Sequence, residues 1–153
     1  MRIIGIDPGT FCGWAIIDNG TRIGSGVWNL KGGRHEGGGM RYLRARKLFE
    51  SIADSHSIDA VAYEEVRRHQ GVDAAHIYGG IVGQITAVCE DRQIPFQAIP
   101  VGTAKRTATG KGNASKDMMI EAARDRWSCI IDDDNEADAL WMAQTLHNEL
   151  NTT

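Results

Sequence analysis

The dipeptide Asn19-Gly20 constrains the fold of this chain more than any other short stretch, because apolar segments lie on both sides of it. Asn-Gly readily adopts the positive φ angles of a type I′ turn, which joins two antiparallel strands. We therefore expect residues 13–17 and 21–28 to pair as a hairpin. Residues 2–6 form a third apolar segment, separated from the hairpin by the turn residues Pro8-Gly9-Thr10. The chain should begin with three antiparallel strands.

The rest of the chain alternates between helical and extended patterns. Ala45, Leu48, Phe49 and Ile52 recur at helical spacing and predict a helix over residues 40–55. The remaining elements are expected in the order strand, helix, strand, helix, helix, at residues 58–64, 77–92, 96–99, 115–127 and 135–150.

Two glycine-rich segments interrupt these patterns. Residues 32–39 predict a mobile loop. Residues 102–113 carry three glycines and three basic residues, and they predict a flexible polar connection rather than part of the core. Ser115 or Asn113 would then cap the helix that follows.

This order of elements predicts an α/β fold with a mixed five-stranded sheet and helices on both faces. The length of 153 residues suffices for a full hydrophobic core, so we expect one domain over residues 1–153. No apolar run approaches the roughly 20 residues that span a bilayer, and the first residues lack the features of a signal peptide. Three cysteines without paired spacing suggest neither disulfides nor a zinc site. We expect a cytoplasmic protein with no membrane contact.

Charge is unevenly distributed, although the net charge is only −3. Residues 92–116 contain five Lys or Arg and no acid, whereas residues 128–153 contain six acids and no Lys or Arg. Adjacent blocks of opposite sign are suited to a protein that holds both phosphate groups and metal ions.

Three carboxylates stand where regular elements begin or end. Asp7 and Glu64 follow apolar strand segments, and Asp138 lies near the start of the last helix. Taken singly, each has an ordinary explanation: a turn, a solvent-facing strand end, and a favourable helix N-terminus. Brought together, they would repel one another unless they shared protons or divalent cations. Oxygen ligands of this kind suit Mg²⁺ or Mn²⁺, and two such ions can promote phosphodiester hydrolysis.

The motifs around these acids resemble those of a known family. GIDPGT at residues 5–10, AYEE at 62–65 and EADAL at 136–140 are similar to the three acidic motifs of the RuvC family of Holliday-junction resolvases. VGTAKR at 101–106 and GNASKDMM at 112–119 resemble the basic segment of that family. Order and spacing agree over almost the whole chain, and the length resembles that of short phage-encoded members.

The resemblance implies a ribonuclease-H-like endonuclease that cuts four-way or other branched DNA by paired symmetric nicks. It further implies a homodimer with two Mg²⁺ or Mn²⁺ ions per active site, no organic cofactor, and a bacterial or phage-infected host cell. By position, Asp7, Glu64 and Asp138 match metal-binding acids of the family. Lys105 and Lys116 match basic residues that the family places beside the scissile phosphate.

Two positions depart from the family pattern. The fourth acid usually stands three residues before Asp138, where this chain has Asn135. Asn135 could still ligate a metal through its amide oxygen, and Asp134 on the same helical face could replace it. Where bacterial members carry an aromatic residue, this chain has Arg67. Arg67 and Arg68, together with Arg106 and Lys111, are therefore expected to contact the DNA backbone.

Other functions remain open at the level of sequence. A Gly-x-Asp-x-Gly-Thr segment also occurs in actin-like and sugar-kinase ATPases, but those folds need a second subdomain. A ribonuclease-H-like nuclease could instead cut RNA–DNA hybrid or other branched DNA, and a non-catalytic module could bind junctions without cutting them. For the homodimer, Gly79, Gly80 and Gly83 suggest close packing of their helix against a second copy, although a helix in the core would explain them as well.

Overall fold

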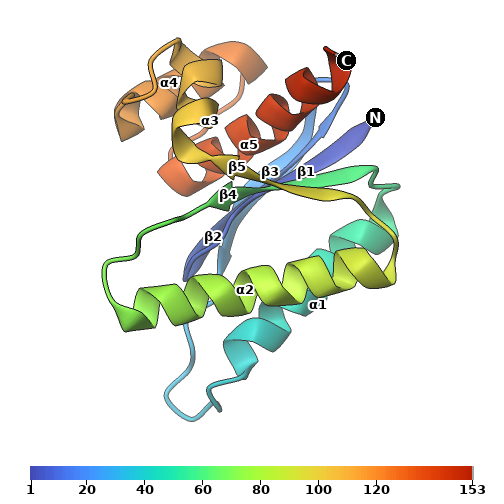
Figure 1. Cartoon of the computed structure of the whole chain (residues 1–153), viewed down its shortest axis with the longest axis vertical. Coiled ribbons are helices and arrows are strands. Elements are labelled where there is room, and N and C mark those ends of the chain that lie inside the picture. Colours follow the sequence, from blue (N-terminus) through green and yellow to red (C-terminus); the bar gives the residue numbers. More distant parts are fainter. Residues whose placement is uncertain (153) are drawn as a thin grey trace.

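The computed structural model describes residues 1–152 and contains one mixed five-stranded sheet (Figure 1). Its strands, in chain order, are β1 (Arg2–Asp7), β2 (Phe11–Asp18), β3 (Thr21–Asn29), β4 (Ala60–Glu65) and β5 (Phe96–Pro100). In space they follow the order β3-β2-β1-β4-β5. The first three strands pair antiparallel, whereas β4 runs parallel to both β1 and β5. The predicted mixed sheet is confirmed.

The hairpin between β2 and β3 forms at the predicted turn. Asn19 and Gly20 have φ angles of 50° and 85°, the left-handed conformations that a type I′ turn requires. The Gly20 carbonyl accepts hydrogen bonds of 3.0 Å from the side chains of Arg126 and Trp127. The turn is therefore tied to a distant part of the chain.

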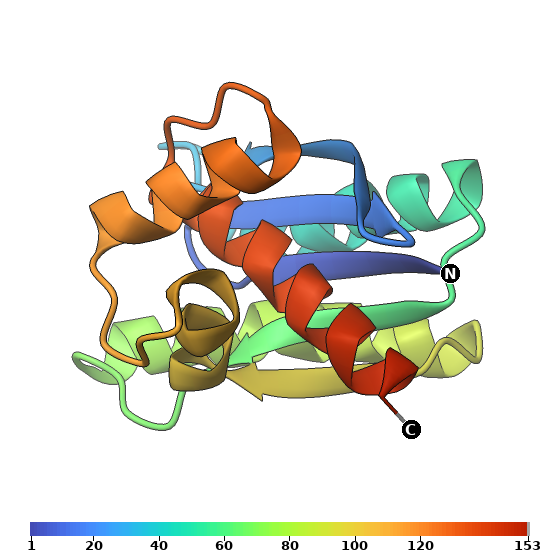
Figure 2. The same ribbon diagram turned by 90° about the horizontal axis from the view of Figure 1, so that it is seen from above.

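Helices cover both faces of the sheet, as predicted. On one face lie α1 (Met40–Ser55) and α2 (Val72–Asp91). On the other lie α3 (Val101–Thr109), α4 (Lys116–Trp127) and α5 (Asp134–Asn151). Figure 2 shows α5 crossing the sheet diagonally, with α3 and α4 beside it. None of the helices described in residues 1–152 has the length and apolar character needed to cross a membrane.

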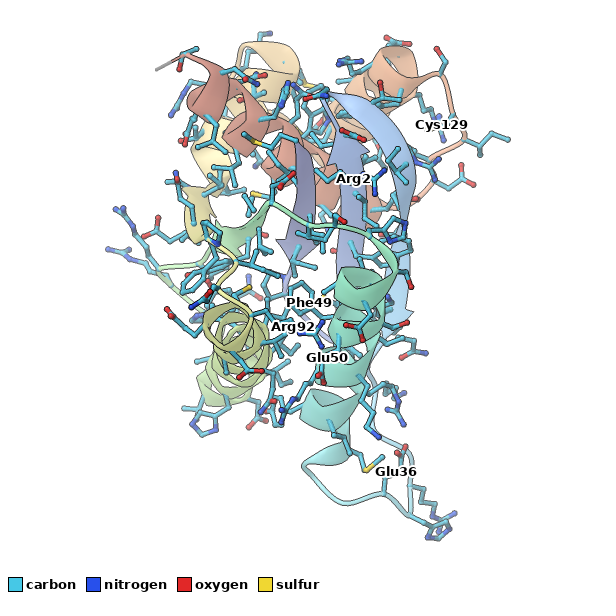
Figure 3. The ribbon with its side chains drawn as sticks, turned by 90° about the vertical axis from the view of Figure 1, so that its right-hand side faces the viewer. Arg2, Glu36, Phe49, Glu50, Arg92 and Cys129 are labelled. Carbon is cyan, nitrogen blue, oxygen red and sulfur yellow. The ribbon has the colours of Figure 1, made fainter. Side chains whose placement is uncertain are left out.

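The alternation of side chains along β1 supplies two separate cores. Ile4 and Ile6 face α1 and α2, whereas Ile3 faces α5. Phe49 of α1 is fully buried in the first of these cores (Figure 3), which confirms the predicted apolar face of that helix. Arg92, which follows α2, forms ion pairs with Glu50 and Asp54 of α1 and so joins the two helices.

The backbone of α5 lies directly against β1 and β2 at two glycines. A Cβ atom on Gly13 would overlap the carbonyl oxygen of Asn135, and one on Gly5 would overlap that of Ala139. Side chains normally stand between a helix and the sheet that it covers, so only glycine permits this direct contact. The close contact sets how near the first turns of α5 lie to the end of β1.

Two sequence expectations about helices were wrong. Residues 102–113 were expected to form a flexible connection, but α3 occupies residues 101–109. Gly110 ends this helix with a φ of 81°, so the glycine marks a helix C-terminus. Buried Ala104 and a hydrogen bond of 3.0 Å between the Thr145 and Thr107 hydroxyls hold α3 on α5.

The other error concerns α2, which begins at Val72 instead of residue 77. Its first turn includes Val72, Asp73 and Ala74, all exposed, and so carries no apolar periodicity. The helix after residue 115 begins as predicted, because the Ser115 hydroxyl accepts a hydrogen bond from the Met118 amide at 3.2 Å.

The contact between Gly13 and α5 leads to a first prediction. Gly13→Ala should lower the free energy of unfolding by about 1–3 kcal/mol, the usual cost of overpacking, because the methyl group must push α5 away from β2. Urea denaturation would measure this change. Gly32→Ala is the matched control, since a Cβ at that position meets nothing within 4 Å. An unfolding midpoint for Gly13→Ala equal to that of the control would contradict the assigned contact.

Candidate metal centre

Three of the predicted acids meet at one end of the sheet. The pairing of Ile6 with Tyr63 in the parallel strands β1 and β4 places Asp7 beside Glu64. Asp138 reaches the same point from the second turn of α5. One carboxylate oxygen from each of these three residues lies within 4.8 Å of the other two. The expected convergence of Asp7, Glu64 and Asp138 is thus present in the fold.

The electrostatics of this cluster are unfavourable for three free carboxylates. Asp7 is only 8% exposed. Its burial raises its pKa well above the usual range, and the hydrogen bond with Glu64 and the charges of Glu64, Asp138 and Asp134 raise it further. Burial, Glu64 and Asp134 also raise the pKa of Asp138 to about 7, although Lys105 and Lys116 counteract part of this effect.

These features fit a divalent cation. Carboxylates that repel one another in a poorly solvated site are stabilised either by protons or by a positive ion. The ligand atoms are hard oxygens, which suit Mg²⁺ or Mn²⁺. Cys12 lies close by but is an unsuitable ligand, because burial and the charge of Asp7 raise the pKa of its thiol to about 12.

The three consecutive acids at the start of α5, Asp132 to Asp134, have different roles. Asp132 forms an ion pair with Arg124 at 2.9 Å. Asp133 caps α5, because its side chain accepts hydrogen bonds from the Asn135 and Glu136 amides at 2.7 and 3.3 Å. The charge of Asp134 instead affects the acidic cluster, because it raises the pKa of both Asp7 and Asp138. The sequence did not distinguish these three roles.

Asn135 follows Asp134 in the first turn of α5. Its carbonyl group lies against Gly13 of β2, so its backbone is fixed by the contact between α5 and the sheet. Its amide carries no charge and does not contribute to the electrostatic repulsion. Of the two candidates for a fourth ligand, Asp134 is the one whose charge reaches the cluster.

Two of the predicted basic residues flank the acids. Lys105 of α3 and Lys116 at the start of α4 both act on the pKa of Asp138. The Lys116 ammonium group also lies 3.6 Å from Asp134. Both lysines therefore lie near the acidic cluster, where the family resemblance led us to expect them.

The other predicted basic residues lie elsewhere. Arg106 lies against Gly112 of the α3–α4 connection and donates a hydrogen bond of 3.4 Å to the Thr103 hydroxyl. Lys111 is exposed in that connection. Arg67 is exposed in the segment after β4 and pairs with Glu65 at 3.1 Å, and Arg68 is exposed beside it. These residues present positive charge at the surface but are not part of the acidic cluster.

The site also depends on residues whose roles sequence reasoning missed. Gly5 and Gly13 allow α5 to approach the sheet, although both were expected only to be strand residues. Their placement within otherwise apolar strands is the signal that could have revealed them, because a glycine there often marks a close backbone approach.

Comparison with known proteins identifies the family of the chain. A model of the family described as "Crossover junction endodeoxyribonuclease RuvC" matches residues 3–145. Among curated proteins with that same description, the one from Wolbachia is 29% identical over 78% of this chain and 76% of its own length. The one from Chlamydia abortus is 31% identical over 76% and 73%. The one from Rickettsia conorii is 27% identical over 95% and 96%.

Solved structures give the same result for the fold. Thermus thermophilus RuvC, in a complex with Holliday junction substrate, has a TM-score of 0.86 at 22% identity and covers 99% of this chain and 97% of its own. The yeast mitochondrial Holliday junction resolvase has a TM-score of 0.65 at 15% identity, with coverage of 95% and 77%. The predicted ribonuclease-H-like fold is confirmed. The family match over residues 3–145 shows that the alternative of an actin-like or sugar-kinase ATPase is wrong.

The raised pKa of Asp138 predicts how metal-free protein responds to pH. A carboxyl group whose pKa is higher in the folded state binds more protons there than in the unfolded chain, so stability falls as pH rises from about 4 to about 7. Asp138→Asn removes this titration. Above pH 7 we expect the variant to melt at a higher temperature than the native protein. The difference should be about 2–4 °C for each kcal/mol that the substitution adds to the free energy of unfolding.

Thermal melts in EDTA across pH 5–8 would measure the difference between the two proteins. Saturating Mg²⁺ should reduce or reverse it, because the native carboxylate then gains a cation. Melting curves that respond to pH in parallel would show that Asp138 is not desolvated in the folded state.

The charge of Asp134 and the neutral amide of Asn135 predict different effects of substitution on the Mg²⁺ requirement. Asp134→Ala should raise the Mg²⁺ concentration for half-maximal activity by about 10-fold or more, within the range for loss of a supporting group. Asn135→Asp should change it little. Metal titrations of both variants test this. The opposite result, a lower requirement in Asn135→Asp with no effect of Asp134→Ala, would assign the fourth position to residue 135.

Proposed function

Because the chain belongs to the RuvC family of crossover junction endodeoxyribonucleases, we propose that it resolves four-way DNA junctions by paired symmetric nicks. The observation that carries this proposal is the convergence of Asp7, Glu64 and Asp138 within 4.8 Å. Carboxylates gathered in this way, with lysines beside them, suit the hydrolysis of a phosphodiester bond.

Asp7, Glu64 and Asp138 would hold the metal ions, with Asp134 or Asn135 completing the set. Two bound Mg²⁺ or Mn²⁺ ions would supply an activated water molecule and neutralise charge on the phosphate. Asp7 is buried at the end of β1, which would restrict the movement of its carboxylate. No organic cofactor is required by this chemistry.

Lys105 and Lys116 would contact the phosphate that is cut. Both act on Asp138, and their ammonium groups would stabilise negative charge that develops on the phosphate oxygens. Arg67, Arg68 and Lys111 are exposed and would contact the DNA backbone farther from the cut. Arg106, which packs against Gly112, would contribute less to binding than these three.

Paired nicks in opposing strands need two equivalent active sites, so we further propose a homodimer. Among the three glycines of α2, Gly80 lies against the Tyr42 ring of α1, which explains it within one chain. Gly79 and Gly83 have open space beside them. These two glycines support an approach of α2 to a second copy.

The curated relatives carry the same description and support this substrate over the alternatives. Activity on RNA–DNA hybrid or other branched DNA would use the same acids, whereas a non-catalytic junction-binding module would not need them. The bacterial sources of the relatives named above support action on DNA in the bacterial cytoplasm, or in the cytoplasm of a phage-infected host.

Cleavage assays would test the proposal. Synthetic four-way junction, Y-fork, duplex and RNA–DNA hybrid would each be incubated with the protein and Mg²⁺ or Mn²⁺. We expect paired nicks in the junction, and no cleavage above background by Asp7→Asn. That variant should bind the junction at least as well as the native protein, because it removes a negative charge that faces phosphate. Undiminished cleavage by Asp7→Asn would refute the assigned site.

A further inference from the structure

Tyr78 of α2 makes two hydrogen bonds to the backbone around Glu65, at the end of β4. Its hydroxyl donates to the carbonyl oxygen of Glu64 at 2.7 Å and accepts from the amide of Val66 at 3.3 Å. The side chain is half-buried, and its ring lies 5.0 Å from that of His69. One hydroxyl therefore binds the peptide groups on both sides of Glu65.

These two backbone groups point toward β1. The Val61 amide donates a hydrogen bond of 2.9 Å to the carbonyl of Pro95, which directly precedes β5. The backbone N–H and C=O groups of Val61 therefore point toward β5. Backbone groups alternate in direction along a strand, and Glu64 and Val66 therefore face the opposite neighbour, β1. In the ordinary course of a sheet, residues that follow Asp7 would bind these groups.

The residue that follows Asp7 is Pro8, which cannot donate a backbone hydrogen bond to β4. Val61 stands opposite Phe96, and its amide donates to Pro95, the residue before Phe96. In the same parallel pattern, the carbonyl of a residue accepts a hydrogen bond from the residue that follows its partner on the neighbouring strand. Asp7 stands opposite Glu64 when the register of Ile6 and Tyr63 is continued. The donor for the Glu64 carbonyl would thus be Pro8, which has no N–H group.

In the same pattern, the carbonyl oxygen of residue 8 would accept a hydrogen bond from the Val66 amide. Tyr78 therefore replaces both hydrogen bonds that a strand residue at position 8 would make. Pro8, Val66 and Tyr78 line a common hollow, which is where the chain after β1 has separated from β4. The hydroxyl fills the gap in hydrogen bonding that this separation leaves.

We propose that Tyr78 is a positioning residue that fixes the Glu64 carboxylate for metal binding. The Glu64 carbonyl and its side chain share one α-carbon, so a hydrogen bond that fixes the peptide also restricts the direction of the carboxylate. The bond to Val66 also fixes the start of the segment that carries Arg67 and Arg68. This inference rests on the proposed function for its metal site and goes beyond it in assigning a role to α2.

Tyr78→Phe would test the inference, because it removes the hydroxyl and keeps the ring. We expect Mn²⁺ affinity, measured by calorimetry without DNA, to fall by about 10-fold or more. The kcat for junction cleavage should fall similarly, whereas junction affinity without divalent metal should change less than about 2-fold. Hydrogen exchange at the Val66 amide should become faster.

Tyr42→Phe is the matched control. Its hydroxyl donates to the His76 carbonyl at 3.3 Å, so this change also removes one tyrosine hydrogen bond to a backbone group, away from β4. We expect native Mn²⁺ affinity and cleavage in this variant, and similar melting temperatures for both variants.

Equal Mn²⁺ affinities in Tyr78→Phe and Tyr42→Phe would overturn the inference. A general loss of the fold in Tyr78→Phe alone would overturn it too, because the hydroxyl would then support the whole structure. If the native protein cut no junction, the proposed function would fail, but the Mn²⁺ titrations would still decide the role of Tyr78.

Discussion

The contact between the backbone of α5 and the strands β1 and β2 determines the geometry of the rest of the site. Gly5 and Gly13 leave no side chain between helix and sheet, so the start of α5 lies close to the end of β1. Ser25 of β3 donates a 2.7 Å hydrogen bond to Glu136 and secures the same turn from the other side. Since this approach is backbone against backbone, it cannot be adjusted by a change of rotamer, and Asp138 is held rigidly beside Asp7.

The basic and acidic blocks, which are separate along the chain, lie close together in the folded protein. Lys105 of α3 and Lys116 of α4 lie near the acidic residues at the start of α5. Lys116 lies 3.6 Å from Asp134, and Lys105 and Lys116 lower the pKa of Asp138. The two lysines reduce the repulsion among the acids but do not remove it, because burial and like charge still hold the pKa of Asp138 at about 7. The remaining excess of negative charge would give the proposed site its affinity for divalent cations.

The sequence predicted those parts of the structure that depend on local chemistry. Asn19-Gly20 specified a turn by its backbone preferences, and the apolar spacing from Ala45 to Ile52 specified the face of α1. Motif order also identified Asp7, Glu64 and Asp138 as candidate ligands. The helix α3 was missed because its glycine Gly110 ends a helix, whereas a glycine in an unpatterned segment equally suggests a loop. Its stability comes from packing on α5, which has no local signature.

Other parts of the site could not be predicted, because they depend on the rotation of one element against another. Whether Asp134 or Asn135 faces the cluster depends on how α5 is turned, and this follows from Gly13 and from the capping of the helix by Asp133. The role of Tyr78 is similar. Its spacing in α2 gives no sign that its hydroxyl reaches β4, and the missing donor at Pro8 matters only once the two strands are paired.

The two cores and the site make opposite contributions to stability. Buried apolar side chains on both faces of the sheet stabilise the fold, whereas the clustered acids destabilise it without a cation. The destabilised region lies at one end of the sheet, where the pairing of β1 with β4 ends. The hydrogen bond that Tyr78 donates to Glu64 holds the end of β4 in place, and the one that Asp133 accepts from Asn135 holds the start of α5. The fold thus confines the repulsion to side chains, which would leave the backbone already arranged for the metal ions that we propose.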